Sequence, residues 1–314
     1  MQRIRNKYLL ASFVFLTIVS AALLFLSREG IRPVINKDLF RVDTDKIDEV
    51  ILQSPTAKVQ LKFESNQWKV NDKWGADAGM IKVLFATLKQ IEPRRPVASV
   101  IKDSIRNMLE QKGVKVTLSG SDVSTEVFYA AGNTLKTETW FMKADDPQPY
   151  TMVIPGYRVY VAGILELDES GWRNKRIFDF NERNFKALSF AYVKDPKQNF
   201  EIELKGRELS IKNMQSFDSV KLDGYLGAVS LIFASRFIAP DASGLDSLVS
   251  TPPEIRIEIK DIASRTFSLE LFAPKVNDPE VYGRLGDGQL VAIDRDAAAD
   301  IVRSREYFLK KADK

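Results

Sequence analysis

Alternation of apolar and polar positions along several segments of the chain predicts β-strands. Val59, Leu61 and Phe63 alternate with polar residues, a period of two that is typical of a half-buried strand, and a strand is predicted over 58–64. Residues 77–91 instead place apolar residues three and four positions apart, which predicts an amphipathic helix. A short helix is predicted over 103–111. Further strands are predicted over 47–53, 67–71, 113–118, 125–130, 137–143, 149–154 and 157–161.

The same pattern recurs 141 residues later. Adding 141 to the numbers of Leu61 and Phe63 gives Ile202 and Leu204, which again alternate with polar residues. This shift also matches Trp68 with Leu209, Val70 with Ile211, the apolar face of 81–91 with that of 222–232, and strand 114–118 with 255–259. Because strand, strand, helix and strand recur in one register, the chain is expected to contain a tandem duplication. We expect Phe63 and Leu204 at equivalent core positions.

The second repeat is expected to run from a first strand to a closing helix. Asp287-Gly288, between two apolar segments, is a typical hairpin turn. The predicted elements are strands over 187–193, 199–205 and 208–212, a helix over 218–237, strands up to 293 and a helix over 295–309. Hairpins with separate helices predict an α+β fold, in which an antiparallel-sheet-plus-helix module is duplicated. The expected repeat units are residues 38–180 and 181–314.

A membrane anchor is predicted near the N-terminus. Residues 8–26 contain no charge, and as a helix they would span about 28 Å, close to the apolar thickness of a bilayer. Three basic residues precede this run, whereas Arg28 beside Glu29 follows it. The positive-inside rule then places residues 1–7 as a cytoplasmic tail and residues 27–37 as an extracytoplasmic linker.

A cleaved signal peptide is the alternative interpretation of this segment. Ser20-Ala21-Ala22 has the small residues that cleavage requires, but the apolar run continues directly through residues 23–26. We therefore favour an uncleaved anchor. The expected location is the bacterial inner membrane, with a single span, a cytoplasmic N-terminus and a periplasmic C-terminal domain.

Composition excludes several kinds of chemistry. The chain has no histidine and no cysteine, so it lacks the usual general base at neutral pH, the commonest zinc ligand and thiolate nucleophiles. The net charge of +4 comes mostly from residues 1–30, which carry +3. The remaining chain is nearly neutral, which argues against a nucleic-acid partner.

Three motifs resemble functional sites only in part. Ser99-Val100-Ile101-Lys102 matches the Ser-x-x-Lys motif of penicillin-binding proteins, but the accompanying Lys-Thr-Gly is missing. The acidic segment 43–49 lacks the glycine and glutamate of a calcium loop. The glycine-rich segment 283–288 lies within a hairpin rather than before a helix. We therefore predict no catalytic, cofactor-binding or metal-binding residue.

Two remaining features leave alternatives open. Trp172 precedes three basic residues and is consistent with a contact surface, although a solvated basic stretch is the favoured interpretation. Any two of the 42 acidic residues could also form the carboxylate pair of a glycosidase, and the sequence does not identify them.

The order of these features resembles a bacterial family known as domain of unknown function 4340. The similarity covers about residues 38–310 and includes strand 59–63, Trp68-Lys69-Val70, the helix after Asp77, and the joint Trp172-Arg173-Asn174-Lys175-Arg176-Ile177-Phe178. The resemblance implies an envelope protein, often anchored at its N-terminus. Its genes commonly neighbour permease and auxiliary subunits of ABC transporters of the gliding-motility type. It implies no catalytic residues.

Two functional hypotheses follow. The first is a non-enzymatic, membrane-anchored periplasmic accessory or scaffold protein of an envelope complex, associated with an ABC transporter permease or auxiliary subunit. It binds the lipid bilayer through residues 8–26 and needs no cofactor. The alternative is an anchored carboxylate-dependent hydrolase acting on cell-wall or surface glycans.

Overall fold

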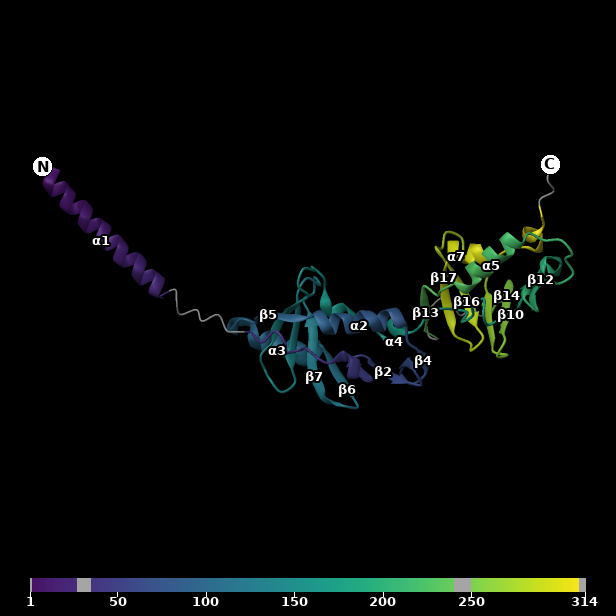
Figure 1. Ribbon diagram of the computed structural model, residues 1–314, viewed down its shortest axis with the longest axis horizontal. Coiled ribbons are helices and arrows are strands. Elements are labelled where there is room, and N and C mark those ends of the chain that lie inside the picture. The colour runs from purple at the N-terminus through teal and green to yellow at the C-terminus, as the bar shows by residue number, and fades with distance from the viewer. Residues whose placement is uncertain (1, 27–34, 240–249, 311–314) are drawn as a thin grey trace. The chain divides into compact units, whose positions relative to one another are not determined.

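The computed structural model describes residues 2–26, 35–239 and 250–310 (Figure 1). The chain forms two compact units: the first contains residues 1–47, 52–55 and 84–166, and the second contains residues 48–51, 56–83 and 167–314. Most of the predicted linker, residues 27–34, lies outside the described residues.

The N-terminal helix α1 (Gln2–Leu26) contains the predicted anchor. Its large apolar side chains between Tyr8 and Leu23 are exposed, with exposed fractions from 39% at Val19 to 73% at Tyr8. The side chains of residues 2–6, 9 and 24–26 lie outside the described part. Within the described residues, no helix combines the length and the apolarity that crossing a membrane requires.

A nine-stranded antiparallel sheet occupies most of the first half of the chain, in the order β4-β3-β2-β1-β6-β7-β8-β9-β5. Its strands are β1 (Glu49–Gln53), β2 (Lys58–Glu64), β3 (Gln67–Val70), β4 (Trp74–Gly75), β5 (Glu92–Pro96), β6 (Val114–Gly120), β7 (Val123–Gly132), β8 (Thr139–Lys143) and β9 (Tyr150–Val153). The prolines of β5 are tolerated because β5 is an edge strand and lacks a second ladder to satisfy.

Two helices accompany this sheet. Helix α2 (Ala78–Gln90) matches the predicted 77–91 segment, and the Asp77 carboxylate caps it by accepting a hydrogen bond from the Gly79 N–H at 2.7 Å. Helix α3 (Ser99–Lys112) begins earlier than the predicted residue 103 and buries Leu109 against Trp140. Three phenylalanine rings, those of Phe40, Phe128 and Phe141, form a buried aromatic cluster.

An eight-stranded antiparallel sheet follows, in the order β12-β11-β10-β14-β15-β16-β17-β13. Its strands are β10 (Phe185–Tyr192), β11 (Phe200–Lys205), β12 (Glu208–Ile211), β13 (Arg236–Ile238), β14 (Ile255–Asp261), β15 (Thr266–Leu271), β16 (Glu280–Leu285) and β17 (Leu290–Asp294). Helices α5 (Ser219–Ser230) and α7 (Arg295–Ile301) cover one face of this sheet (Figure 1).

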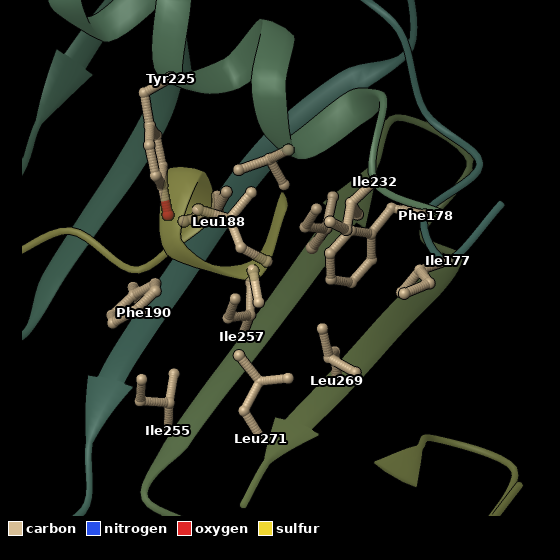
Figure 2. Packing of buried hydrophobic residues seen from close by; sticks show 14 of the residues in the cluster. Ile177, Phe178, Leu188, Phe190, Tyr225, Ile232, Ile255, Ile257, Leu269 and Leu271 are labelled. Carbon is tan, nitrogen blue, oxygen red and sulfur yellow. The ribbon is translucent and has the colours of Figure 1, made fainter. Parts of the chain in front are cut away.

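The core of the eight-stranded sheet lies under these helices. Figure 2 shows Tyr225 of α5 on the same side of the sheet as Leu188, Ile257 and Leu269, which come from three neighbouring strands. All four side chains are buried. The period-two alternation along each strand places these apolar residues on one face.

Three predicted elements are wrong in extent or type. Residues 157–161 form no strand, and a short 3-10 helix follows at Val161–Ile164. The helix predicted over 218–237 ends at Ser230, because the chain then forms edge strand β13. The final helix predicted over 295–309 stops at Ile301 and is followed by a 3-10 turn at Arg305–Phe308.

Corresponding strands of the two sheets have the same order, apart from β4, which is an extra edge strand. Their pairing registers also match at the shift of 141 in three of the strand pairs, whereas β16 is displaced by one residue, because Phe128 pairs with Lys143 but Leu269 pairs with Leu285. Leu61 pairs with Val70, and Ile202 pairs with Ile211. The shift applies equally to β6–β7 and β14–β15, where Val116–Phe128 corresponds to Ile257–Leu269, and to β5–β9 and β13–β17, where Pro96–Tyr150 corresponds to Phe237–Val291.

The expectation that Phe63 belongs to the core is wrong. Phe63 is 42% exposed and packs against Trp68, with the ring centroids 5.6 Å apart. Leu204 is half-buried and contacts the core from its edge. The alternation of β2 places Phe63 on the same face as buried Leu61, but Phe63 lies near the C-terminal end of the strand.

Candidate functional site

The strongest candidate site surrounds the Trp172–Phe178 segment, which lies in the second compact unit. Trp172 and Arg173 are only 0% and 6% exposed, so the interpretation as a solvated basic surface is wrong for these two residues, whereas Arg176 is exposed. One side of the segment forms backbone hydrogen bonds with residues at the end of β4 and just after it. The Asp77 N–H donates to the Trp172 carbonyl at 2.8 Å, and the Asn174 N–H donates to the Gly75 carbonyl at 2.8 Å.

The other side of the same segment bonds to residues just before β13. The Ala234 N–H donates to the Lys175 carbonyl at 2.8 Å, and the Ile177 N–H donates to the Ile232 carbonyl at 3.1 Å. The Lys175 ammonium also donates to the Ser235 carbonyl at 3.0 Å. The segment therefore holds β4 and β13 in place within one compact unit.

Arg173 is inserted between two aromatic rings. Its guanidinium carbon lies 3.7 Å from the centroid of the Trp74 ring and 3.6 Å from that of the Phe237 ring. A planar guanidinium can stack on both faces at once, and such contacts are stronger where water is excluded. One guanidinium nitrogen donates to the Gln289 side-chain carbonyl at 3.2 Å. We call Arg173, Trp74 and Phe237 the arginine clamp.

Burial and two nearby carboxylates have opposite effects on the pKa of Arg173. Burial lowers the pKa of Arg173 from its ordinary value, whereas Glu169, 3.9 Å away, and Asp287 act in the opposite direction. An arginine keeps its proton at neutral pH even when its pKa is lowered. The clamp is therefore cationic, with its charge compensated locally.

A short helix positions the first residues of the site. Helix α4 (Glu169–Trp172) is capped by Asp168, whose carboxylate accepts a hydrogen bond from the Gly171 N–H at 2.9 Å. The Glu169 carboxylate accepts a hydrogen bond from the Asn71 amide at 2.7 Å. Both acids thus have structural partners.

An open groove of about 510 Å³ adjoins the arginine clamp. Its polar lining includes Lys58, Asn71, Asp168, Glu169, Ser170 and Gln289. Because its two carboxylates cap a helix and bond an amide, this groove is better suited to holding backbone segments than to proton transfer. Among the described residues, no group of three or more acidic side chains is arranged to hold a metal ion.

Two of the other sequence candidates, Ser99 and Asp45, belong to the first compact unit. Ser99 begins helix α3, and the Asp45 carboxylate forms an ion pair with Lys89 at 2.7 Å. This hydrogen bond and the charge of Lys89 lower the pKa of Asp45, as expected for a solvated acidic turn. The hairpin predicted at 287–288 is confirmed: it joins β16 and β17, and Gly288 has the positive φ of 85° that favours glycine.

Sequence reasoning did not identify the arginine clamp. The signal available was the Trp172-Arg173 pair itself, since an apolar residue beside arginine suits a buried cation with aromatic neighbours as well as a solvated surface. The ring partners Trp74 and Phe237 are distant in sequence, and no local pattern connects them with Arg173.

Comparison with known proteins gives one match. Residues 68–247 match the family described as "Domain of unknown function (DUF4340)", more than half of the chain. No curated protein and no solved structure matches the chain. The matched region includes the arginine clamp, helices α2 and α5, and strands of both sheets. The chain therefore belongs to the DUF4340 family, whose resemblance was expected from the order of its strands, helix and arginine-rich joint.

Proposed function

We propose that the protein is a non-enzymatic accessory or scaffold subunit of a bacterial envelope complex, anchored in the inner membrane by α1. The observation that carries this proposal is the apolar surface of α1, whose large side chains between Tyr8 and Leu23 are exposed to solvent. Apolar surface on this scale is costly in water and favourable in a lipid bilayer.

The charges around α1 support an orientation. The basic residues Arg3, Arg5 and Lys7 precede the uncharged run of residues 8–26, and cytoplasmic flanks are enriched in lysine and arginine. In the proposed arrangement residues 1–7 are cytoplasmic, and both sheets lie in the periplasm.

Composition and site geometry favour a binding role over catalysis. The chain has neither histidine nor cysteine. The acids of the groove beside the arginine clamp are engaged as a helix cap and as a partner of Asn71. A transporter permease or auxiliary subunit is the proposed partner, because the family resemblance implies that such subunits are encoded nearby.

Copurification tests this role. The tagged full chain is extracted from gently solubilised membranes, beside an equally tagged unrelated single-pass protein as the control. We expect permease or auxiliary subunits of an ABC transporter to be recovered with the full chain and to be absent from the control. Recovery of the protein alone, under conditions that keep a known transporter complex intact, would contradict the proposed partner.

We also propose that the two sheets arose by a tandem duplication of one module. The equal strand order supports an origin of the two sheets from one ancestral module, and so do the matching registers of β2–β3 with β11–β12 and of β6–β7 with β14–β15 at a shift of 141. Homologous chains provide the test. If the module was duplicated, the sequences of the two halves should align with each other at this shift across many family members.

A further inference from the structure

A second groove, of about 790 Å³, lies in the eight-stranded sheet away from the arginine clamp. It is bounded by the β11–β12 hairpin, by helix α5 and by residues 180–185. Its apolar floor consists of Phe180, Phe185, Leu204, Leu209 and Leu226. Both phenylalanines are buried, and the three leucines are half-buried against the core. We call this the α5 groove.

The counterparts of the floor residues in the nine-stranded sheet are larger. At the shift of 141, Leu204 and Leu209 correspond to Phe63 and Trp68, whose rings pack together at 5.6 Å. Leu226 likewise corresponds to a phenylalanine, at position 85. The β2–β3 and β11–β12 hairpins have identical registers, so these positions are equivalent in the backbone.

Helix α5 also carries smaller residues than α2 at two equivalent positions. Lys89 of α2 forms an ion pair with Asp45, whereas its counterpart on α5 is the smaller Ser230. Gly227 stands where α2 has alanine, and a Cβ atom added at Gly227 would meet open space. Five replacements by smaller residues at one place leave a groove with an apolar floor, and a folded chain gains no packing from such a groove unless something fills it.

The rim of the α5 groove carries charges of both signs. Arg183 and Arg207 supply two guanidinium groups, and Glu182 and Asp223 supply two carboxylates. None of these four side chains has an ion-pair partner within the described part of the chain. All four are exposed, so a ligand head group could pair with either charge.

We propose that the α5 groove binds a single-chain zwitterionic amphiphile, namely a lipid whose head group carries both a phosphate and a primary amine. The acyl chain would cover the apolar floor, the guanidinium groups of Arg183 and Arg207 would hold the phosphate, and the carboxylates of Glu182 and Asp223 would accept hydrogen bonds from the ammonium. This pairing uses each rim charge, whereas a purely anionic ligand would leave two carboxylates beside its own negative charge.

The chemistry of each contact supports this assignment. Guanidinium groups bind phosphate through paired, charge-assisted hydrogen bonds. A groove of this volume falls in the range that accommodates a small-molecule ligand, and its apolar floor and charged rim offer contacts to the two ends of an amphiphile. The proposal depends neither on α1 nor on the transporter, because it uses only residues of the eight-stranded sheet and its helix.

Photo-crosslinking with the full chain tests the proposal. The probe is an acyl phosphoethanolamine with one acyl chain that carries a diazirine, and the matched probes have a phosphoglycerol or a phosphocholine head group. Crosslinked peptides are mapped by mass spectrometry, which separates labelling of the groove from labelling of α1. We expect the phosphoethanolamine probe to label the peptides that contain Leu204, Leu209 and Leu226 about tenfold more strongly than either matched probe, because only its ammonium donates charge-assisted hydrogen bonds to the carboxylates.

Paired variants locate the binding. Gly227→Trp fills the groove and should reduce labelling of these peptides at least about tenfold. Gly224→Trp makes the same change on the same helix at a glycine that does not line the groove, and it should leave labelling unchanged. Leu204→Phe combined with Leu209→Trp installs the side chains of the nine-stranded sheet and should also abolish labelling. Gly224→Trp controls for loss of folding. A loss of labelling in Gly227→Trp alone would therefore show that the probe occupies the α5 groove.

Three results would overturn the proposal. Labelling confined to α1 would show that the probe meets only the apolar helix. Equal labelling by the phosphoglycerol probe would show that the carboxylates have no role in recognition. Unchanged labelling in Gly227→Trp would place the lipid elsewhere on the molecule.

Discussion

The two sheets of this protein have the same strand order, apart from β4, and share the pairing register of three strand pairs, but they differ at their surfaces. Buried positions of one sheet are buried in the other: Leu84 and Tyr225 occupy equivalent helix positions and are 0% and 2% exposed. At the periphery, the nine-stranded sheet has aromatic side chains and an ion pair where the eight-stranded sheet has leucines and a serine. Both sheets therefore share buried apolar positions that stabilise the fold. They differ at the α5 groove, where we propose that a lipid binds.

The turns after β6 and β14 show the same contrast. Gly120 ends β6, and a Cβ atom added there would lie 1.9 Å from the Lys46 carbonyl oxygen. Its counterpart Asp261 ends β14 and instead holds its turn through hydrogen bonds from Arg265. Equivalent positions thus allow a close approach of the backbone in one sheet and form a charged pair in the other.

The largest expected effect comes from the equivalent helix cores. Leu84→Ala and Tyr225→Ala each remove a buried side chain and should lower the free energy of unfolding by about 3–5 kcal/mol. Urea denaturation of each variant measures this loss. A loss below about 1 kcal/mol for either variant would show that the two positions do not have equivalent roles in packing.

The arginine clamp is expected to have the next largest effect. Arg173→Ala removes a guanidinium stacked between Trp74 and Phe237 and should cost about 2–4 kcal/mol. Arg173→Lys should recover little of this loss, because an ammonium is not planar. Hydrogen exchange at the Asp77 and Asn174 amides, which bond across the segment, should accelerate in both variants.

Arg176 is the matched control for the clamp. It is an exposed arginine of the same segment, 5.8 Å from the Phe233 ring, and Arg176→Ala should change stability by less than about 0.5 kcal/mol. Equal effects of the two alanine substitutions would contradict a special role for the buried arginine.

Most of the fold was predictable because it depends on local periodicity. Strand β2 has the predicted bounds, and α2 differs by one residue at each end. Edge strand β5 was missed because its sequence Glu92-Pro93-Arg94-Arg95-Pro96 has no alternation, and its pairing with β9 comes from tertiary context. The site was less predictable. Trp74, Arg173 and Phe237 meet only after the chain folds, and sequence pattern alone does not show that the arginine is buried.

A smaller effect on stability is expected from the hydroxyl group of Tyr225, which its counterpart Leu84 lacks. The Tyr225 hydroxyl is buried without a hydrogen-bond partner among the described residues, and burial raises its pKa well above the ordinary value. Tyr225→Phe removes this hydroxyl and should stabilise the protein by about 1 kcal/mol. Thermal denaturation measures the change, and a destabilisation would indicate that the hydroxyl has a partner in solution.

The pH dependence of the β14–β15 turn is the smallest expected effect. Burial alone would raise the pKa of Asp261, but the hydrogen bonds and charge of Arg265 outweigh it, and the net pKa is lowered. A carboxyl with a lowered pKa in the folded chain stabilises the protein above its unfolded pKa, near 3.9, and this contribution is lost as the pH falls through the folded pKa.

Asp261→Asn should therefore destabilise the protein at pH 7, and the difference from the unsubstituted chain should shrink as the pH falls below about 4. Urea denaturation at a series of pH values measures this difference. Gly120, the counterpart of Asp261, has no ionisable side chain, so no matching contribution comes from that position. A difference that is constant over the acid range would show that the carboxylate charge has no role.

We propose that α1 anchors the protein in the inner membrane with both sheets outside the cytoplasm, and protease accessibility is a direct test of this arrangement. Spheroplasts carrying the full chain are treated with external protease, and the membranes are washed with alkaline carbonate. We predict that residues 38–314 are digested in intact spheroplasts, that the untreated chain stays with the membrane, and that its N-terminus is Met1 or Gln2. A soluble chain that begins near Leu23 would contradict the anchor, and full protection of residues 38–314 from protease would contradict the periplasmic location.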